Sequence, residues 1–192
     1  MAAILRQPDT KGRNVSDWRT RLQVLYELQK KVNEAQGLPG PSPLVTTGAS
    51  EQAIAAAEQR LGVVLDSSYS DVLRAVNGWP SFALSWNLFA AEDLGQSHGL
   101  WAEANRDATA YFDGEGDHAV TVPRGRKRVL LAAGADSARF LVGMLDTAAG
   151  AAASPCYDCA YGEDIEYASF QDWVAAMESE ARSIISEESG LP

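Results

Sequence analysis

The sequence predicts an α+β fold: a central, mainly antiparallel twisted sheet flanked by helices, with an added N-terminal helix. Apolar residues recur every three or four positions in some segments, as on one side of a helix. In others they recur every second position, as on one face of a strand. After the first helix, the predicted order is helix, helix, strand, helix, several strands, helix. Because the strands are partly segregated from the helices, we expect a mainly antiparallel sheet.

The first helix is predicted for residues 15–35, where Trp18 and Leu22 belong to one apolar stripe. Asn14 or Ser16 is the expected N-cap. The stripe either packs within the chain or forms a dimer contact. We therefore expect a monomer, or a homodimer formed through this helix.

A segment rich in proline and glycine, GLPGPSP, follows this helix. It predicts a semi-stiff connector, because proline restricts the backbone and removes hydrogen-bond donors. We divide the chain into an N-terminal tail and amphipathic helix (1–36), a linker (37–45) and an α+β domain (46–188).

The central part of the chain has the most consistent local signals. Two helices are predicted there, one capped by Ser50 and ended by Gly62, the other capped within residues 66–68 and ended by Asn77-Gly78. Each end has the residue types that helix termini favour, so the boundaries of these two helices are well specified.

Trp79-Pro80 is expected to turn the chain into one strand over residues 82–88, where apolar and polar residues alternate. Further strands are predicted at 119–122, 129–133, 139–145, 156–161 and 165–167, and further helices at 100–112 and from Ser169 onward.

Charge is unevenly distributed along the chain. The net charge is −10, but residues 1–40 carry +3 and residues 41–192 carry −13. A domain with this much negative charge repels phosphate backbones, and we therefore do not expect it to bind nucleic acid. Encounter with a basic protein is favoured instead. The alternative is that the charge only keeps the protein in solution.

The sequence predicts a cytoplasmic protein without membrane contact. No apolar run approaches the roughly 20 residues that span a bilayer, and the N-terminal residues lack the apolar core of a signal peptide. The two cysteines, Cys156 and Cys159, do not make a disulfide framework. Their C-x-x-C spacing lacks the further ligands of a zinc site, so ordinary thiols are the favoured interpretation over a metal or redox role.

No coherent catalytic site is evident. The G-x-S-x-G pattern of serine hydrolases occurs around Ser97, but no buried strand precedes it. Asp113, Glu115 and Asp117 alternate with glycine as in a calcium loop, but the glycine and glutamate needed at the sixth and twelfth positions are absent. We therefore expect a non-enzymatic protein with no catalytic residue, metal or cofactor.

Two further features have alternative interpretations. The basic cluster RGRKR at residues 124–128 is interpreted as a solvated turn between strands. Trp79 follows a turn, where it either caps the core or lines a partner-binding groove, since tryptophan is enriched in such grooves.

A set of residues between positions 46 and 180 carries a resemblance to a known family: Ile54, Glu58, Leu61-Gly62, Leu65, Tyr69, Val72-Leu73, Asn77-Gly78, Trp86, Leu88-Phe89, Glu92, Leu94, Phe140-Leu141, Asp146, Ser169-Phe170, Trp173 and Val174. With this spacing the chain resembles the SUKH superfamily, which contains the yeast cell-wall-synthesis regulator and many bacterial immunity proteins of polymorphic toxin systems. Where the family usually has proline after the second leucine, this chain has Asp66, which we expect to cap a helix. The N-terminal helix and linker are additions to the minimal domain.

The resemblance implies a non-enzymatic α+β domain, and bacterial members are thought to neutralise cognate toxins, often nucleases, by direct binding. We therefore expect a cytoplasmic immunity protein that binds a basic nuclease toxin. The alternative is a regulatory or scaffold module that binds an endogenous cytoplasmic protein. An enzyme acting on a small molecule is a third hypothesis, which a deep pocket with converging polar groups would favour. The candidate partner-binding residues are Trp79, Asp113, Glu115, Asp117, Glu163, Asp164, Glu166 and Glu178.

Overall fold

The computed structural model describes residues 11–82, 86–113, 122–134, 139–147, 153–160 and 163–188. Over these ranges it confirms the predicted α+β class. The helices are α1 (Lys11–Ala35), α2 (Glu51–Leu61), α3 (Ser67–Ala75), α4 (Gly99–Asp113) and α5 (Phe170–Glu188). The strands are β1 (Trp79–Phe82), β2 (Trp86–Leu88), β3 (Arg126–Gly134), β4 (Arg139–Asp146), β5 (Cys156–Ala160) and β6 (Glu163–Tyr167). Residues 119–121 of the strand predicted at 119–122 lie outside the described ranges.

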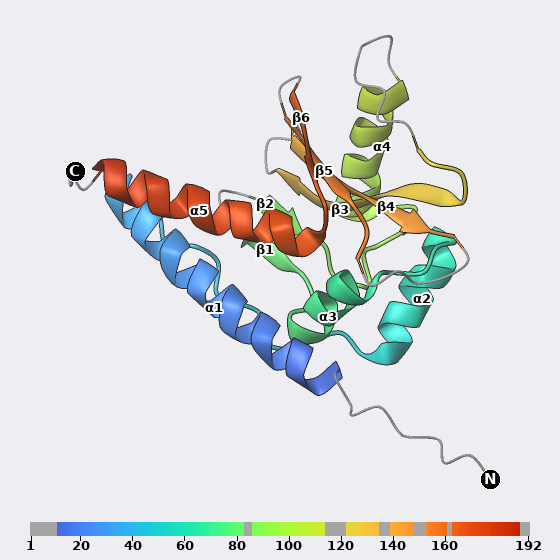
Figure 1. The fold of residues 1–192 in the computed structure, drawn as a ribbon, viewed down its shortest axis with the longest axis horizontal. Coiled ribbons are helices and arrows are strands. Elements are labelled where there is room, and N and C mark those ends of the chain that lie inside the picture. The colour runs from blue at the N-terminus through green and yellow to red at the C-terminus, as the bar shows by residue number, and fades with distance from the viewer. Residues whose placement is uncertain are drawn as a thin grey trace.

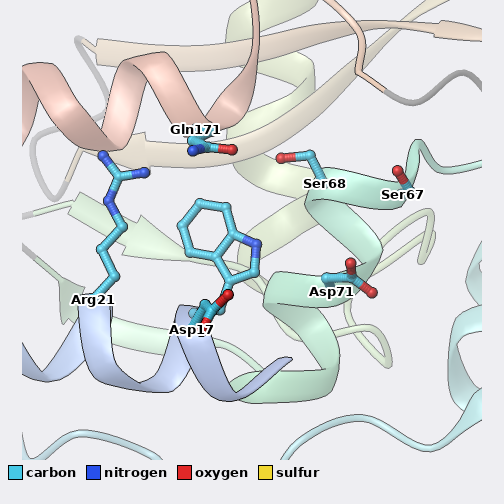
Figure 2. A pocket seen from close by; sticks show the side chains of 7 residues that line it. Asp17, Arg21, Ser67, Ser68, Asp71 and Gln171 are labelled. Atoms are coloured by element: carbon cyan, nitrogen blue, oxygen red, sulfur yellow. The ribbon is translucent and has the colours of Figure 1, made fainter. Parts of the chain in front are cut away.

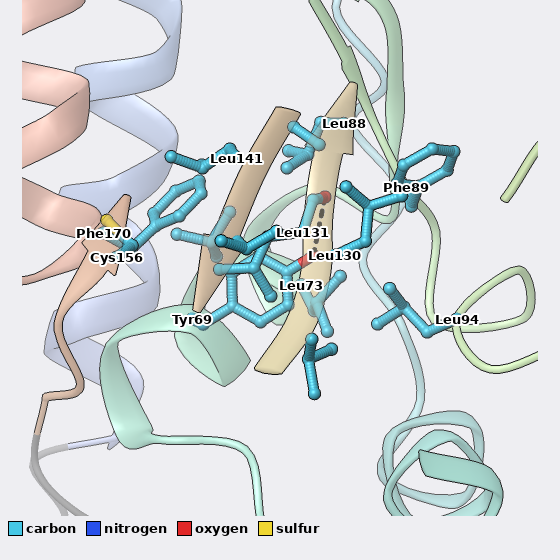
Figure 3. Close-up of a cluster of buried hydrophobic side chains, with 14 of the residues drawn as sticks. Tyr69, Leu73, Leu88, Phe89, Leu94, Leu130, Leu131, Leu141, Cys156 and Phe170 are labelled. Atoms are coloured by element: carbon cyan, nitrogen blue, oxygen red, sulfur yellow. Dashed lines mark hydrogen bonds between the residues drawn. The ribbon is translucent and has the colours of Figure 1, made fainter. Parts of the chain in front are cut away.

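The described strands form one antiparallel sheet in the order β1-β2-β3-β4-β5-β6, so each strand pairs with the next one along the chain. Only α4 interrupts this order, between β2 and β3. Two neighbouring residues of β4 show what covers each face. The Phe140 ring lies 6.2 Å from that of Tyr111 in α4, whereas Leu141 lies in a cluster with Tyr69 of α3 and Phe170 of α5 (Figure 3). The sheet is thus enclosed between α4 and the layer of α3 and α5 (Figure 1).

Aromatic side chains fill the space between the sheet and α5. Trp173 of α5 has its ring centroid 5.7 Å from Phe82, 5.3 Å from Trp86 and 5.3 Å from Phe170. All four side chains are almost completely buried. Stacked, tilted and edge-on aromatic pairs of this kind contribute about 0.5–1.5 kcal/mol each beyond the burial of their area. This cluster joins the first strands to the last helix.

The predicted N-caps of α2 and α3 and the predicted end of α2 at Gly62 are confirmed, whereas α3 ends at Ala75, before the predicted Asn77-Gly78. Ser50 Oγ accepts a hydrogen bond of 3.1 Å from the Ala53 N–H, and Asp66 accepts one of 2.9 Å from the Tyr69 N–H. Gly62 and Gly78 have φ angles of 65° and 79°, which other residues rarely adopt. Capping side chains therefore begin both helices and Gly62 ends α2 as expected, while the left-handed Gly78 lies beyond α3, directly before β1.

The helix α1 is longer than predicted and belongs to the packed core. It begins at Lys11, so Asn14 and Ser16 lie within the helix and neither is its N-cap. Trp18 and Leu22 are buried, and the Trp18 ring lies 6.1 Å from that of Phe170 in α5. The apolar stripe of α1 is therefore covered by α3 and α5 of the same chain (Figure 1).

The segment between α1 and α2 is a strap that follows the body. The Ala49 N–H donates to the Leu73 carbonyl at 2.7 Å, and the Asn77 N–H donates to the Thr47 carbonyl at 3.1 Å. The Trp79 indole N–H donates to the Ser42 carbonyl at 3.1 Å. This segment is itself neither helix nor strand, and these contacts provide hydrogen-bond partners for its backbone groups.

The prediction of a single strand over residues 82–88 was wrong, since the chain forms a hairpin there. Phe82 of β1 pairs directly with Trp86 of β2, and Trp79, expected in the turn, is already in β1. Directly paired residues of antiparallel strands point to the same face. Phe82 and Trp86 are four positions apart, so they share a face in a straight strand and equally in this hairpin. The alternation of apolar residues could not distinguish the two arrangements.

Candidate partner-binding surface

Three of the predicted acidic residues, Glu163, Asp164 and Glu166, lie on β6, at one edge of the sheet. Among the described strands β6 pairs only with β5, in a register that places Asp164 opposite Cys159 and Glu166 opposite Tyr157. Asp164 and Glu166 are two positions apart, so they point to the same face, the one that α4 covers. Both residues are exposed.

A further predicted acidic residue, Asp113, lies in the last turn of α4. The Tyr111 hydroxyl donates a hydrogen bond of 3.0 Å to Asp164 Oδ1, so the end of α4 lies beside β6 (Figure 1). Asp113, two residues further, is the last residue of α4, and its side chain is 65% exposed. We call Asp113, Asp164 and Glu166 the β6–α4 acidic surface.

Neighbouring side chains hold these carboxylates in place. Burial, reinforced by the hydrogen bond to Asp164, raises the pKa of Tyr111 to about 12. Burial, with a contribution from Glu166, also raises the pKa of Tyr157. Both phenols therefore stay protonated at neutral pH and available as donors. Asp113 is oriented from the other side by Arg128, whose Nη2 lies 3.1 Å from Asp113 Oδ1.

The sequence did not single out Tyr111. It is one of the aromatic residues on the apolar side of an amphipathic helix, which predicts burial and nothing more. Its partner Asp164 lies 53 positions later in the chain. No local spacing could have connected the two, because the contact depends on how α4 crosses the sheet.

Trp79 is not part of a partner-binding groove. Its side chain is 1% exposed, and its ring lies 5.0 Å from Phe82 in the core. The turn that would have exposed it does not occur at this position, since Trp79 begins β1. Of the two interpretations of this residue, core packing is correct.

Glu178 does not belong to the acidic surface either. Its carboxylate lies 2.8 Å from Arg21 Nε, and the pair joins α5 to α1. Glu178 was expected to face solvent because the sequence does not reveal that α1 packs along α5. The backbone of Glu163 lies on β6 opposite Ala160, whereas Glu115 and Asp117 lie outside the described residues.

The basic cluster at residues 124–128 is not a solvated turn throughout. Only Arg124 and Gly125 form the turn, and the next three residues begin β3. Arg126 lies 3.3 Å from Asp146, Lys127 donates to the Leu61 carbonyl at 2.7 Å, and Arg128 pairs with Asp113. A run of cations carries no apolar periodicity, so the start of the strand was not visible in the sequence.

Cys156 and Cys159 have the surroundings of ordinary thiols. They are three positions apart in β5, so their side chains point to opposite faces of the sheet. Both are buried, and burial raises the pKa of each thiol well above its usual range. Within the described ranges, no group of three or more histidine, cysteine or acidic residues is arranged to hold a metal ion.

Ser97 lacks the structural context of a hydrolase nucleophile. It lies in an exposed bend between the turn of residues 91–95 and α4, and no strand leads directly into it. The strained strand-to-helix turn that such a serine requires is therefore not formed.

A polar pocket of about 270 Å³ lies where α1, α3 and α5 meet (Figure 2). Arg21 and Asp71 reach it from opposite sides, but each is already paired, Arg21 with Glu178 and Asp71 with Arg74 at 2.9 Å. The other residues that line it are Asp17, Trp18, Ser67, Ser68 and Gln171. None of the sequence-predicted site residues lies there.

None of the helices in the described ranges combines the length and apolar composition needed to cross a bilayer. Comparison with protein-family models gives no match for this chain, and neither does comparison with curated proteins.

Proposed function

We propose that this chain is an immunity protein that neutralises a basic toxin, a nuclease, by binding it through the β6–α4 acidic surface. The observation that carries the proposal is the exposure of Asp164 and Glu166 on one face of the edge strand β6, which the Tyr111 hydroxyl joins to the last turn of α4, the turn that ends with the exposed Asp113. These carboxylates are exposed, and they belong to a chain whose net charge is −10. A surface of this kind is complementary to the cationic groove with which a nuclease holds phosphates.

The resemblance to the SUKH superfamily supports the same class of function. The matching residues with side-chain hydrogen bonds have structural roles. Glu58 accepts from the Leu65 N–H at 2.9 Å, and Asn77 accepts from the Ala91 N–H at 2.8 Å. Such residues maintain the scaffold, so a partner is expected to bind elsewhere on the surface.

Electrostatics would act in two ways in such a complex. Opposite charges accelerate encounter, and carboxylates at the phosphate-binding groove exclude the nucleic acid. Because exposed charges are screened by salt, with a Debye length of about 8 Å at physiological ionic strength, binding is expected to weaken as salt is added.

The test uses the full chain as bait in an extract of its native cells. One bait is wild type, one carries Asp113→Asn, Asp164→Asn and Glu166→Gln, and a matched bait carries Glu27→Gln, Glu34→Gln and Glu187→Gln on α1 and α5. Both variants lose three negative charges. We expect wild type and the matched variant to capture a basic protein whose nuclease activity they inhibit. Equal capture and inhibition by the first variant would contradict the proposal.

The alternative is a regulatory or scaffold module for an endogenous protein. It makes a different prediction in the same experiment: the captured protein has no nuclease or toxic activity, and its gene does not neighbour that of the bait.

A further inference from the structure

A groove of about 420 Å³ lies between the beginning of β3, α4 and the end of α2. Its volume is within the range of small-molecule sites. All five residues from Arg126 to Leu130 line it. Among the described strands, β2 pairs only with Ala132–Gly134 of β3, so this half of β3 has a neighbouring strand, β4, on one side alone. The groove lies along the side of β3 that has no neighbouring strand among those described.

The charge of this groove is opposite to that of the whole chain. Four cationic side chains line it, and no carboxylate does so among the described residues. The four are Arg60 of α2 and Arg126, Lys127 and Arg128 of β3. Arg126 and Arg128 have carboxylate partners outside the lining, Asp146 and Asp113. Two positive charges at the groove are therefore not matched by these pairs.

Neutral carbonyl groups hold the remaining two cations. Lys127 Nζ donates to the Leu61 carbonyl at 2.7 Å, and Arg60 donates to the carbonyls of Leu94 at 2.9 Å and Ala91 at 2.6 Å. A carbonyl orients a cation without cancelling its charge. Both cations therefore have fixed positions in the lining, Lys127 at the end of α2 and Arg60 at the turn of residues 91–95. Fixed positions lower the entropy that is lost when an anion binds.

The opposite wall is suited to a flat ring. The Arg128 guanidinium lies over the Phe112 ring, 4.2 Å from its centroid. A guanidinium stacked on one ring presents its other planar face for a second stacking contact. Asn105 of α4 also lines the groove, is half-buried and makes no side-chain hydrogen bond with a described residue. It is therefore available to a ligand.

We propose that this groove binds a small aromatic anion. The acidic group, a phosphate, lies between Lys127 and Arg60, and the flat ring stacks on Arg128. Ligand binding in this groove does not require the proposed binding of a toxin, although the two sites meet at the pair of Arg128 and Asp113.

Isothermal titration calorimetry of the full chain tests the proposal with four probes: adenosine 5′-monophosphate, phenyl phosphate, adenosine and inorganic phosphate. We expect the two aromatic phosphates to bind more tightly than either adenosine or phosphate alone, and to bind more weakly as salt is added. Lys127→Gln should weaken the aromatic phosphates about tenfold, the effect of losing one hydrogen bond to a charged group. Arg128→Lys keeps the charge and should weaken them about threefold while leaving inorganic phosphate unchanged.

Two controls separate binding from folding. Lys30→Gln on α1 removes a charge far from the groove and should leave all four affinities unchanged. Lys127→Arg keeps the charge and should keep the binding, so a loss confined to Lys127→Gln cannot come from unfolding. The proposal is overturned if neither aromatic phosphate binds at millimolar concentration. It is also overturned if both bind no better than inorganic phosphate, or if folded Lys127→Gln binds as tightly as wild type.

Discussion

Asp66 illustrates at the scale of one residue how a charged group is retained in the interior. Its side chain caps α3 by accepting from the Tyr69 N–H, and the residue is 2% exposed. Burial raises the pKa of the carboxyl group, although hydrogen bonds to the ionised form partly offset this effect. The cap thus stabilises the helix while the charge itself is unfavourable in this position.

Replacing Asp66 separates these two effects. Asp66→Asn keeps an acceptor for the Tyr69 N–H and removes the buried charge, so the free energy of unfolding should stay the same or rise at pH 7. Asp66→Ala removes the cap and should lower it by about 1 kcal/mol. Urea unfolding of both variants gives the comparison. Equal destabilisation by the two substitutions would contradict the capping role.

Tyr111 predicts a change of stability at alkaline pH. Its pKa is near 10.0 when unfolded and about 12 in the folded chain. Below pH 10 its contribution is fully present. Between pH 10 and 12 the unfolded state releases its proton first, so the free energy of unfolding falls. In urea unfolding over this pH interval, the free energy of unfolding of Tyr111→Phe should fall less steeply than that of wild type. Identical slopes would show that the phenol titrates normally.

At the scale of elements, the sequence predicted the helices and the long strands β3 and β4, because their periodicity and caps are local. It did not predict the β1–β2 hairpin, since Phe82 and Trp86 share a face in either arrangement. It also missed the start of β3 at Arg126, where apolar periodicity is absent, and the contact of Tyr111 with Asp164, which is set by tertiary packing. The members of the acidic surface were predicted individually, but their arrangement was not.

Gly78, between α3 and β1, is expected to tolerate a side chain less well than Gly62. Gly78 and Gly62 both have positive φ, but a Cβ on Gly78 would lie 2.8 Å from the Ala90 nitrogen, whereas one on Gly62 would meet nothing within 4 Å. Gly62→Ala should lower the free energy of unfolding by about 1 kcal/mol, because alanine adopts the left-handed backbone conformation less readily than glycine. Gly78→Ala should cost roughly 3 kcal/mol, since steric overlap is added. Similar unfolding midpoints would contradict the close approach of Ala90.

At the scale of the whole molecule, α1 completes the layer that covers one face of the sheet. Its contact with α5 includes the pair of Arg21 and Glu178, whose side chains are 23% and 19% exposed. The opposite face carries α4, and the β6–α4 acidic surface lies at the far edge of the sheet (Figure 1). Stability of the α1 layer and partner binding are therefore expected to be separable.

Glu178→Gln tests this separation. Loss of a partly exposed ion pair should lower the free energy of unfolding by up to about 1 kcal/mol. Because Glu178 faces α1, the affinity for the partner should not change. A loss of affinity without a loss of stability would place Glu178 back in the binding surface, as the sequence alone suggested.

The salt dependence of partner binding tests whether the β6–α4 acidic surface forms the interface. The dissociation constant of the captured protein is measured at two salt concentrations for wild type, the Asp113, Asp164 and Glu166 variant, and the matched variant of equal charge. The first variant should bind on the order of tenfold more weakly at low salt and lose most of the salt dependence, while the matched variant should behave as wild type. Equal salt dependence in all three proteins would contradict this placement of the interface.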